Sequence, residues 1–514
     1  MSADKYRHKY LIGIAVTMAA MLELIDTSIV NVAIPHMMGN LGATLDEISW
    51  VSTGYIIANV IVIPMSGWLA GYFGRQRYLT GSIAIFVASS FFCGAAGSLA
   101  SLIFWRVVQG LGGGALLSTA QATLWEAFPP KEVAIGQAMF GVGVMVGPTL
   151  GPTLGGYIVD NWNWPWIFYI NLPLGIIAGL LVWTYVRDSE HHVKAATIDW
   201  LGIGLLTVGV GSLQWMLERG ERFDWFDSRF VTTLAVTSGT SFILLVWREL
   251  TTEEPIINFR VFHSRQLATG VIMAGLLGFA LFGSVFVLPV FLQGLHGFTA
   301  NQTGLVILPG AIASALTMAV LGRFAARFDA RPLITIGALG FLWCMWKLSN
   351  LTYDTGAADL FWPLVARGVS LGLIFIPLTG ASMAELTPAE ISQGTGMFNL
   401  TRQLGGSLGI AIVATILQRF TAESKQVLTE HLTVNGPDAL ARLDALARGM
   451  ASRGFDAATA HQQALMVMDR MVGAQASVLA FSKIYMISGI ALCFSIPMML
   501  FWRHGKTRSA VQAH

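Results

Sequence analysis

Two carboxylates, Glu23 and Asp26, lie in the first long apolar stretch of the chain, and the amide of Asn31 follows five residues later. At about 100° per residue these side chains share one face of a helix, and the opposite face is apolar. An ionisable group at membrane depth costs about 2.5–3.5 kcal/mol, so it normally faces a cavity and handles protons or substrate. We therefore expect Asp26 to carry protons and Glu23 to be a second titrating or cation-sensing group. The alternative is a carboxylate that a neighbour neutralises merely to hold helices together.

Arg106 lies inside another apolar stretch, Leu-Ile-Phe-Trp-Arg-Val-Val-Gln-Gly. A guanidinium group keeps its proton, so at this depth it needs an anionic partner or several carbonyl groups. The sequence predicts that Arg106 pairs with Asp26 or Glu23 and responds to their protonation. An interfacial arginine that extends outward is the alternative. Arg367, in the corresponding region of the second half of the chain, is expected to be a degenerate counterpart or a structural residue.

Other polar side chains within the apolar stretches are candidates to line a substrate cavity, because polar groups are costly to bury in an apolar environment. Aromatic side chains are abundant, but most would line a bundle interior whatever it binds, so none except Tyr55 is selected. The candidates are Asn31, Tyr55, Asn59, Gln109, Gln121 and Gln293.

Small residues recur at every fourth position between Gly143 and Gly155. In a membrane this spacing lets another helix approach closely, and proline bends the helix that contains it. The stripe either serves packing alone, or seals a cavity and flexes during conformational change. The residues assigned to this motif are Gly147, Pro148, Gly151, Pro152, Gly155 and Gly156.

The composition excludes a soluble globular protein. Hydrophobic residues make up 54% of the 514 residues and charged residues only 12%, whereas an average soluble domain has about 25% charged residues. The net charge of +2 indicates no nucleic-acid partner. Cys93, Cys344 and Cys493 lie apart within apolar stretches and predict neither a disulfide framework nor a metal site. Catalytic constellations and ATP-binding motifs are missing from the sequence, so we expect no enzyme activity and no cofactor.

A window of about 19 residues predicts an all-α polytopic membrane protein with fourteen spans. Several of the spans are rich in glycine or serine rather than leucine. The spans are expected at residues 11–32, 48–70, 78–97, 101–123, 133–157, 165–186, 198–218, 230–249, 268–292, 302–323, 332–350, 360–382, 395–418 and 479–502.

Lysine and arginine gather in alternate connections between these spans. By the positive-inside rule, and because the number of spans is even, we expect both termini in the cytoplasm. Only the connection at 219–229 departs from the bias, and it carries charges of both signs. The basic residues assigned to the inside are Lys5, Arg7, Lys9, Arg75, Arg77, Lys131, Arg187, Lys194, Arg260, Arg265, Arg327, Arg331, Arg503, Lys506 and Arg508.

The sequence repeats itself at an offset of 258 residues, where Pro130, Glu132, Gly136, Met139 and Phe140 recur as Pro388, Glu390, Gly394, Met397 and Phe398. Six spans need only about 180–200 residues, so the offset leaves room for two extra spans between parallel halves. We expect an N-terminal six-helix half at 1–190, two additional helices at 191–258 and a C-terminal six-helix half at 259–514. The last half would include an outside loop at 419–478, with Ala-rich helices at 438–448 and 456–476, that is either a solvated cap or a docking surface.

These stretches together resemble the major facilitator superfamily, and within it the fourteen-span drug:proton antiporters of the EmrB/QacA type. Residues 26–35 are similar to the first-span motif of that branch, residues 102–114 to the motif with a buried arginine, and residues 147–156 to the antiporter motif. Residues 164–175 resemble the sixth-span signature, and residues 211–226 resemble EmrB-like members in particular.

A loop motif of the superfamily is matched by residues 67–77, through Gly67, Gly74, Arg75 and Arg77. Gly71 stands where this motif usually has an aspartate, so the usual partner of Arg75 is replaced.

The resemblance implies a major facilitator fold that exports small hydrophobic or amphipathic drugs across the bacterial inner membrane. The proton gradient would drive export, and no cofactor is implied. Implied partners are protons, membrane lipid, a periplasmic adaptor of the membrane fusion type and an outer-membrane channel, which together would make a three-part pump. An exporter of one endogenous metabolite, such as a fatty acid or siderophore, is one alternative. A membrane sensor or scaffold that does not transport is the other.

Overall fold

The computed structural model describes residues 6–188, 199–252, 255–324, 328–353, 355–388, 390–432 and 436–502. Fourteen helices in this part of the chain are long and apolar enough to cross a membrane, which confirms the predicted number of spans. They are α2 (Lys9–Leu41), α4 (Trp50–Phe73), α5 (Arg75–Gly94), α6 (Leu99–Ala127), α7 (Val133–Asn161), α9 (Asn171–Tyr185), α10 (Trp200–Arg219), α11 (Arg229–Thr251), α12 (Arg265–His296), α13 (Ala300–Phe324), α14 (Ala330–Ser349), α15 (Ala357–Met383), α16 (Ile391–His431) and α18 (Ala457–Cys493).

Short helices join or extend these spans, and α8 continues into α9 as one membrane-crossing unit. The short α-helices are α3 (Leu45–Ile48), α8 (Trp166–Tyr169), α17 (Pro437–Ala451) and α19 (Ser495–Met498). The 3₁₀ helices are η1 (Glu221–Phe223), η2 (Trp225–Asp227), η3 (Phe259–His263) and η5 (Met499–Phe501).

Local sequence signals fix where several helices begin and end. α2 ends at Gly42, whose φ of +61° suits glycine and whose N–H bonds the carbonyl oxygen of Met38. The Ser98 side chain caps α6 by accepting a hydrogen bond from the backbone N–H of Ser101 at 3.3 Å. α2 and α6 are the helices that carry Asp26 and Arg106.

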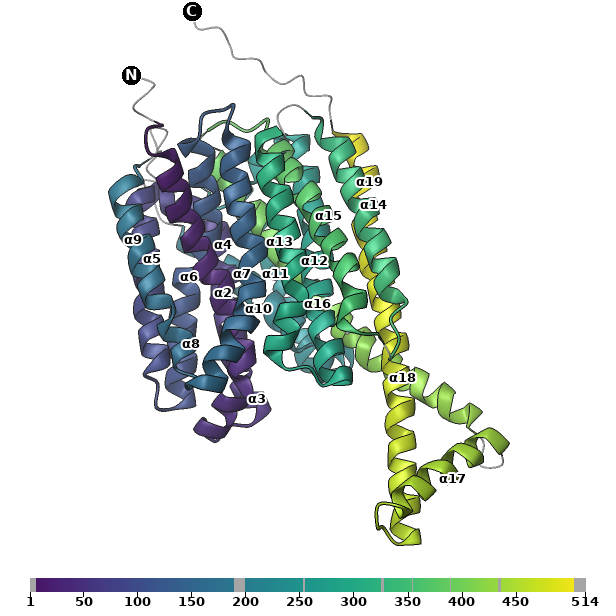
Figure 1. Ribbon diagram of the computed structural model, residues 1–514. Helices are drawn as coiled ribbons and strands as arrows, with labels where there is room; N and C mark the ends of the chain where they lie inside the picture. The colour runs from purple at the N-terminus through teal and green to yellow at the C-terminus, as the bar shows by residue number, and fades with distance from the viewer. Residues whose placement is uncertain are drawn as a thin grey trace, which may run out of the picture.

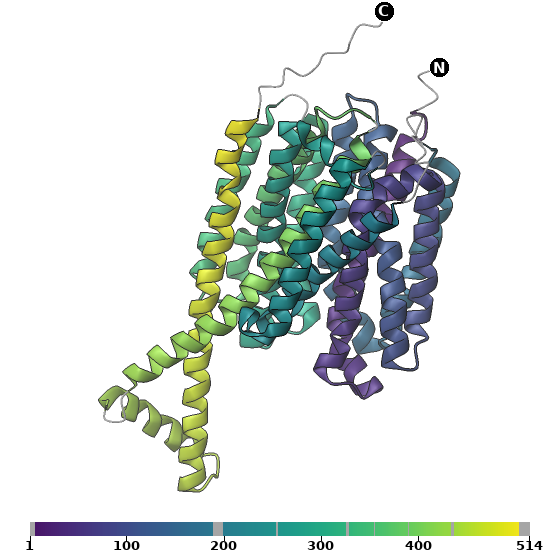
Figure 2. The ribbon, with the colours of Figure 1, turned by 180° about the vertical axis from the view of Figure 1, so that it is seen from behind.

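Twelve of the fourteen spans form two groups side by side, and α10 and α11 belong to neither (Figures 1 and 2). The first group contains α2, α4, α5, α6, α7 and α9, and the second contains α12 to α16 and α18. α2 begins and η5 ends at the same end of the bundle, called here the termini end. The opposite end, called the projection end, carries α17.

The two groups meet along α4 with α16 and along α7 with α13. At Gly67 on α4 an added Cβ would lie 3.1 Å from the backbone of Ser392 at the start of α16, so glycine permits this approach. α10 bridges the groups, because Gln214 donates to Ser407 on α16 at 2.9 Å and Arg219 donates to Ser49 beside α4 at 2.6 Å.

Some predictions lie outside the described residues. The boundary between residues 190 and 191 is one of them, and the division into halves and extra helices therefore stays a prediction. The basic residues Lys5, Lys194, Arg327, Arg503, Lys506 and Arg508 also fall outside the described ranges.

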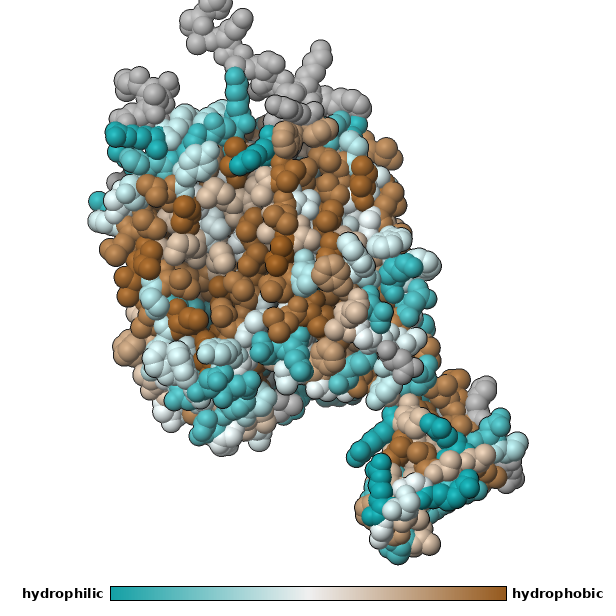
Figure 3. All heavy atoms as spheres, in the orientation of Figure 1, coloured by the Kyte–Doolittle hydropathy of each residue, from teal (hydrophilic) through white to brown (hydrophobic). Residues whose placement is uncertain are grey.

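A belt of hydrophobic side chains covers the middle of the bundle on the face seen in Figure 3, and hydrophilic residues gather at the two ends of that face. Large apolar side chains are exposed on the outer helices, for example Trp247 at 64% and Leu180 at 62% exposure. Such a surface is stable in lipid and not in water. The belt therefore identifies the face of the bundle that lies in the membrane.

The outside loop expected at 419–478 is mainly helix, and α17 and the start of α18 confirm the helices predicted at 438–448 and 456–476. α16 continues thirteen residues beyond the predicted end of its span at 418, and α18 begins at Ala457, well before the predicted span at 479–502. α17 closes the triangle between these extensions (Figure 1). The hydropathy window ended the spans where the sequence becomes polar, but backbone hydrogen bonding carries the helices on through it. We call residues 419–432 and 436–478 the projection.

Candidate functional site

Asp26 and Arg106 form a buried ion pair at the centre of the first group of helices. Arg106 Nη1 donates to Asp26 Oδ2 at 2.5 Å, and their side chains are 1% and 0% exposed. The pair joins α2 to α6. The sequence predicted that Arg106 pairs with either Asp26 or Glu23, and the partner is Asp26. A buried ion pair is stable only when further hydrogen bonds satisfy its remaining polar atoms.

Two amides supply those hydrogen bonds. Gln109 Nε2 donates to Asp26 Oδ1 at 3.0 Å, and Gln109 Oε1 accepts from Arg106 Nη1 at 2.7 Å. Asn171 Nδ2, on α9, donates to the same Oδ1 at 2.8 Å. Asp26 therefore receives hydrogen bonds from three side chains on two neighbouring helices, and the one from Arg106 is charge-assisted.

The guanidinium group of Arg106 is held on its other sides as well. Its Nε donates to the carbonyl oxygen of Val51 at 3.1 Å, and the ring centroid of Tyr55 lies 4.0 Å from its Cζ. Phe168 lies farther away, at 5.7 Å. Both cation–π contacts and the hydrogen bonds fix Arg106 in place, so this ion pair is rigid in the observed conformation.

Glu23 lies one turn from Asp26 but has a different environment. Asn59 Nδ2 donates to Glu23 Oε1 at 3.0 Å, and the second carboxylate oxygen, Oε2, is buried without a hydrogen-bond partner. The residue is 6% exposed. A buried, ionised carboxylate is expected to accept several hydrogen bonds, so Glu23 is under-satisfied compared with Asp26.

A second polar cluster connects the two groups of helices. Asn399 Nδ2 on α16 donates to Gln121 Oε1 on α6 at 2.6 Å, and Gln121 Nε2 donates to Gln137 on α7 at 3.3 Å. Arg402 Nη2 donates to Asn399 Oδ1 at a long 3.4 Å. Glu23 and Arg402 lie within range of a direct electrostatic interaction across the junction. The described clusters thus connect α2 with the second group of helices.

The glycine stripe of α7 packs against α2. An added Cβ at Gly147 would lie 2.9 Å from Leu24 Cβ, and one at Gly155 would lie 2.8 Å from Ile29. Gly151 meets Ser28 and Ile29, whereas Gly156 faces α13 at Asn301. Pro148 and Pro152 lie within the same helix. The stripe therefore lets α7 approach the helix that carries both carboxylates.

The loop motif has an alternative pairing. Arg75 Nη2 donates to Glu126 on α6 at 2.7 Å, so Glu126 provides the carboxylate that Gly71 lacks. Gly74 has a φ of +86°, a conformation that favours glycine, and Arg77 is exposed. The motif therefore joins α5 to α6 at the termini end.

Two predicted cavity residues lie apart from both clusters. Asn31 is exposed and accepts from Ser52 at 3.3 Å, and Gln293 is exposed near the end of α12. Within the described chain, groups of three His, Cys, Asp or Glu placed to hold a metal ion do not occur.

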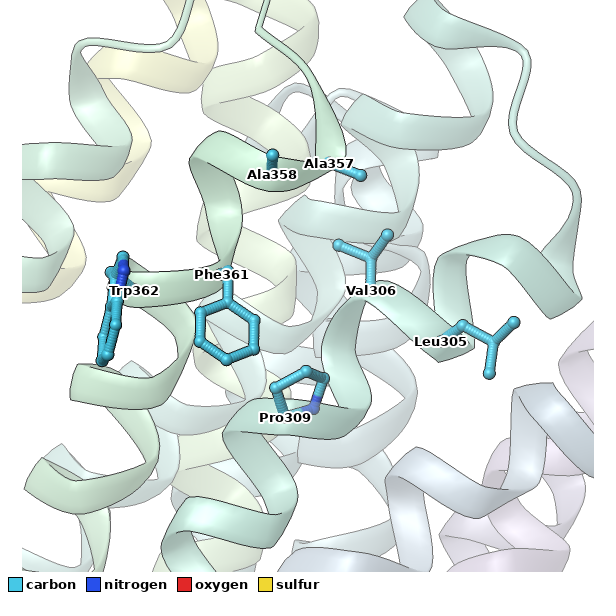
Figure 4. A pocket seen from close by; sticks show the side chains of 7 residues that line it. All are labelled: Leu305, Val306, Pro309, Ala357, Ala358, Phe361 and Trp362. Carbon is cyan, nitrogen blue, oxygen red and sulfur yellow. The ribbon is translucent and has the colours of Figure 1, made fainter.

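A hollow of about 510 Å³ lies at the outer surface between α13 and α15 (Figure 4). Its lining contains no ionisable side chain and includes exposed Trp362 and Leu305, so it is part of the hydrophobic surface and not of either polar cluster. The lining residues are Leu305, Val306, Pro309, Ala357, Ala358, Phe361 and Trp362.

The sequence prediction did not select Asn171, Asn399 or Arg402. Asn171 lies in a stretch noted for its resemblance to the sixth-span signature, and an amide at the start of an apolar run was the available signal. Arg402 lies within a predicted span, where an arginine is as unusual as Arg106, and the same argument could have identified it.

Comparison with known proteins agrees with this architecture. The family model described as Major Facilitator Superfamily matches residues 16–410. The chain is 35% identical over 434 residues to the multidrug export protein EmrB of Escherichia coli K12, covering 84% of each chain. It is 31% identical over 489 residues to the fatty acid resistance protein FarB of Neisseria gonorrhoeae, covering 95% of each chain.

Solved structures share the fold at much lower sequence identity. A double tryptophan mutant of XylE matches with a TM-score of 0.63 and 13% identity, covering 97% of this chain and 96% of that one. The human organic anion transporter MFSD10 matches with a TM-score of 0.61 and 12% identity, covering 94% of this chain and 99% of that one. From its motifs, its fourteen spans and these matches, the chain belongs to the major facilitator superfamily and is an EmrB-type multi-pass efflux transporter of the bacterial inner membrane, not an enzyme.

Proposed function

We propose that this chain is a proton-coupled antiporter that exports hydrophobic or amphipathic toxic compounds, and that Glu23 exchanges the protons. The observation that carries the proposal is the unpartnered Oε2 of Glu23, which is buried beside the junction between the two groups of helices. An antiporter needs a carboxylate that is stable both with and without its proton during the transport cycle. Glu23 can take up a proton at Oε2 without breaking a hydrogen bond.

Asp26 is less suited to that task in the observed conformation. Protonation of Asp26 would leave Arg106 as a buried charge without an anionic partner, which is strongly unfavourable. We therefore reverse the order of the two carboxylates expected from the sequence. Glu23 becomes the proton carrier, and the Asp26–Arg106 pair becomes the rigid element that positions α2 against α6.

The position of Glu23 supplies a route from protonation to conformational change. Ionised Glu23 attracts Arg402 of the second group of helices, and a proton on Glu23 removes that attraction. α2 also packs against the glycine stripe of α7, which contacts the second group through α13. Proton binding would thus weaken one contact across the junction and shift the balance between outward-facing and inward-facing states.

The names of the relatives support the substrate class, since EmrB of Escherichia coli is a multidrug export protein. The positive-inside rule supports an orientation with the termini end in the cytoplasm and the projection end in the periplasm. The proton gradient would then drive export without a cofactor.

The projection is the proposed contact with a periplasmic adaptor, which would in turn connect to an outer-membrane channel. Its helices expose apolar side chains away from the lipid belt, including Leu440 at 44%, Leu465 at 47% and Met466 at 54%. Such side chains outside a membrane are typical of a protein-binding surface. This supports the docking alternative over a simple solvated cap.

Proteoliposomes that contain the purified protein and an imposed pH gradient test the proposal. We expect a hydrophobic drug to dissipate the gradient in the native protein, and Glu23→Gln to abolish dissipation while retaining drug binding. Asp26→Asn is also expected to lose export, with a lower thermal stability. Asp160→Asn, the same chemical change at an exposed position of α7, serves as the control and should behave as the native protein.

Full coupling in well-folded Glu23→Gln would contradict the assigned role of Glu23. Failure of a broad panel of drugs to dissipate the gradient would contradict drug antiport altogether. It would favour either an exporter of one endogenous metabolite or a sensor or scaffold.

A further inference from the structure

A small cavity of about 50 Å³ lies at the junction between the two groups of helices. Four helices of the second group line it together with α7 of the first group. The lining residues are Val144, Met145, Pro148 and Thr149 on α7, Leu281, Phe282 and Val285 on α12, Gly310, Ala311 and Ser314 on α13, Arg367, Gly368 and Leu371 on α15, and Arg402 on α16. A position between the halves is where transporters of this fold change access from one side of the membrane to the other.

Three of the lining residues carry buried polar atoms without a hydrogen-bond partner. These atoms are Ser314 Oγ, Arg367 Nη1, and both Nε and Nη1 of Arg402. The three residues are 2%, 4% and 0% exposed, respectively. Every one of these atoms can donate a hydrogen bond, whereas buried polar groups in proteins are almost always paired.

The cavity is lined by two positively charged side chains, Arg367 and Arg402, and few negative charges lie near them. None of the lining residues is acidic. Arg402 has only the long contact with Asn399 and the electrostatic interaction with Glu23, and Arg367 faces the neutral Cys344 and Tyr485. Arg402 has only the nearby carboxylate of Glu23, which a proton can neutralise, and Arg367 interacts with no carboxylate among the described residues, so a further anion would be stabilised here.

We propose that this cavity binds the anionic headgroup of an amphipathic substrate, with Arg402 and Arg367 as the charged ligands and Ser314 as a further donor. This inference rests on the export function proposed above and specifies one substrate class for it. A volume of about 50 Å³ accommodates a carboxylate and not a whole drug, for which pockets of roughly 300–1,000 Å³ are usual. The apolar side chains of α7 and α12 at the cavity wall provide the surface for the substrate's hydrocarbon part.

Calorimetric titration of the detergent-purified full chain tests the inference with four probes. Octanoate carries both the charge and the tail, octan-1-ol only the tail, octylammonium the opposite charge, and acetate the carboxylate alone. We expect octanoate to bind at least about tenfold more tightly than each of the other three, because charge-assisted hydrogen bonds are the strong ones. Equal binding of octanoate and octan-1-ol would overturn the inference, and binding of acetate as tight as octanoate would indicate a site for small free anions.

Two variants act on the site in different ways. Arg402→Gln removes a ligand and is expected to weaken octanoate binding about tenfold without changing the binding of octan-1-ol. Ser314→Asp places a carboxylate beside both arginines, so it should abolish octanoate binding and raise the thermal stability. Arg402→Lys, which keeps the charge, should recover part of the affinity. Arg323→Gln removes an exposed arginine from the same helix as Ser314 and is the matched control.

Unchanged octanoate affinity in folded Ser314→Asp would overturn the assignment even if Arg402→Gln fails to fold. The result can also be separated from the proposed function. Drug-driven proton movement without octanoate binding would reject the anion site and leave antiport standing. Octanoate binding that depends on Arg402, without transport of any compound, would leave the anion site standing and reject antiport.

Discussion

The two groups of helices pack through glycines at corresponding positions, but they contain different buried charged residues. Gly147 of α7 meets Leu24, and Gly405 of α16, 258 positions later, meets Gly275 of α12. The next contacts repeat this pairing, since Gly151 meets Ser28 and Gly409 meets Phe279. The residues that these glycines contact on α2 and on α12 are 251 positions apart in both cases. The same offset makes buried Leu277 the counterpart of Asp26.

The arginines also occupy different positions. Gly110 of α6 meets the carbonyl of Tyr55, and Gly368 of α15 meets the carbonyl of Gly310. These glycines are 258 positions apart, so Arg367 is the counterpart of Gln109. The sequence predicted that Arg367 corresponds to Arg106. Arg367 instead lies one helical turn away from that position, which buried Leu364 occupies.

This difference indicates a division of tasks between the halves. The first half contains a charge pair whose polar atoms are satisfied, and such a pair fixes helices. The second half contains arginines with unpaired atoms beside a cavity, which leaves them available to a ligand. One scaffold therefore holds a compensated and an uncompensated charge cluster.

The largest expected difference comes from removing one buried arginine from each group of helices, Arg106 from the first and Arg367 from the second. Arg106→Met leaves Asp26 as an uncompensated buried charge and should destabilise the protein by about 3–5 kcal/mol. Arg367→Met removes a charge that lacks a carboxylate partner and should be neutral or stabilising. Unfolding of the two purified variants in detergent measures the difference, and an equal loss of stability would contradict the comparison.

A carboxylate at position 277, which corresponds to Asp26, should make the charge arrangement of the second group of helices more similar to that of the first. Leu277→Asp alone buries a charge, but Arg367 can compensate it, so the same substitution should be worse in an Arg367→Met background. We expect a coupling free energy of about 1–3 kcal/mol from a double-mutant cycle of unfolding measurements. Additive effects would show that these positions do not face each other.

The shared packing predicts that small substitutions at these glycines of α7 and α16 destabilise the protein. Gly147→Ala places a Cβ 2.9 Å from Leu24 Cβ, and Gly405→Ala places one against the backbone oxygen of Gly275. Gly147→Ala should cost about 1–3 kcal/mol through overpacking, Gly405→Ala should cost more because it meets backbone, and both should reduce the rate of drug efflux. Gly81→Ala on α5 has open space around its Cβ and is the control. Full efflux in both stripe variants would remove the proposed need for close packing.

The smallest effect is expected in the projection, which belongs to the second half alone. Hydrogen bonds from the Thr459 hydroxyl and N–H lower the pKa of Asp456, which caps α18. Because the folded-state pKa is depressed, the cap stabilises the helix above the ordinary pKa of an aspartate, and this stabilisation is lost as the pH falls through the folded-state value. The protection of the first turns of α18 against amide hydrogen exchange, expressed relative to the intrinsic exchange rate at each pH, should therefore fall on acidification, and Asp456→Ala should abolish this pH dependence.

Hydropathy and residue type were sufficient to predict much of this protein. The fourteen spans followed from apolar length alone, and the pairing of Arg106 with Asp26 followed from the cost of burying either charge by itself. The extension of α16 beyond residue 418 and the joining of the two predicted segments of α18 into one helix did not follow, because hydropathy reports where a helix leaves lipid and not where it ends. The sequence also did not predict that Asn31 and Gln293 are exposed, because a polar residue type within a span does not indicate whether its side chain faces the interior or the outside of the bundle.

The sequence by itself determined that the chain spans a membrane, that a segment recurs at an offset of 258 residues and that ionisable groups lie within the spans. Those conclusions depend on transfer free energies and spacing, which are local properties. Only the tertiary structure decided that Asp26 is saturated with donors, that Glu23 keeps a free oxygen and that Arg402 and Arg367 share a cavity. Hydrogen-bond satisfaction depends on which helices are neighbours and at what register, and close contacts between glycines and backbone set that register.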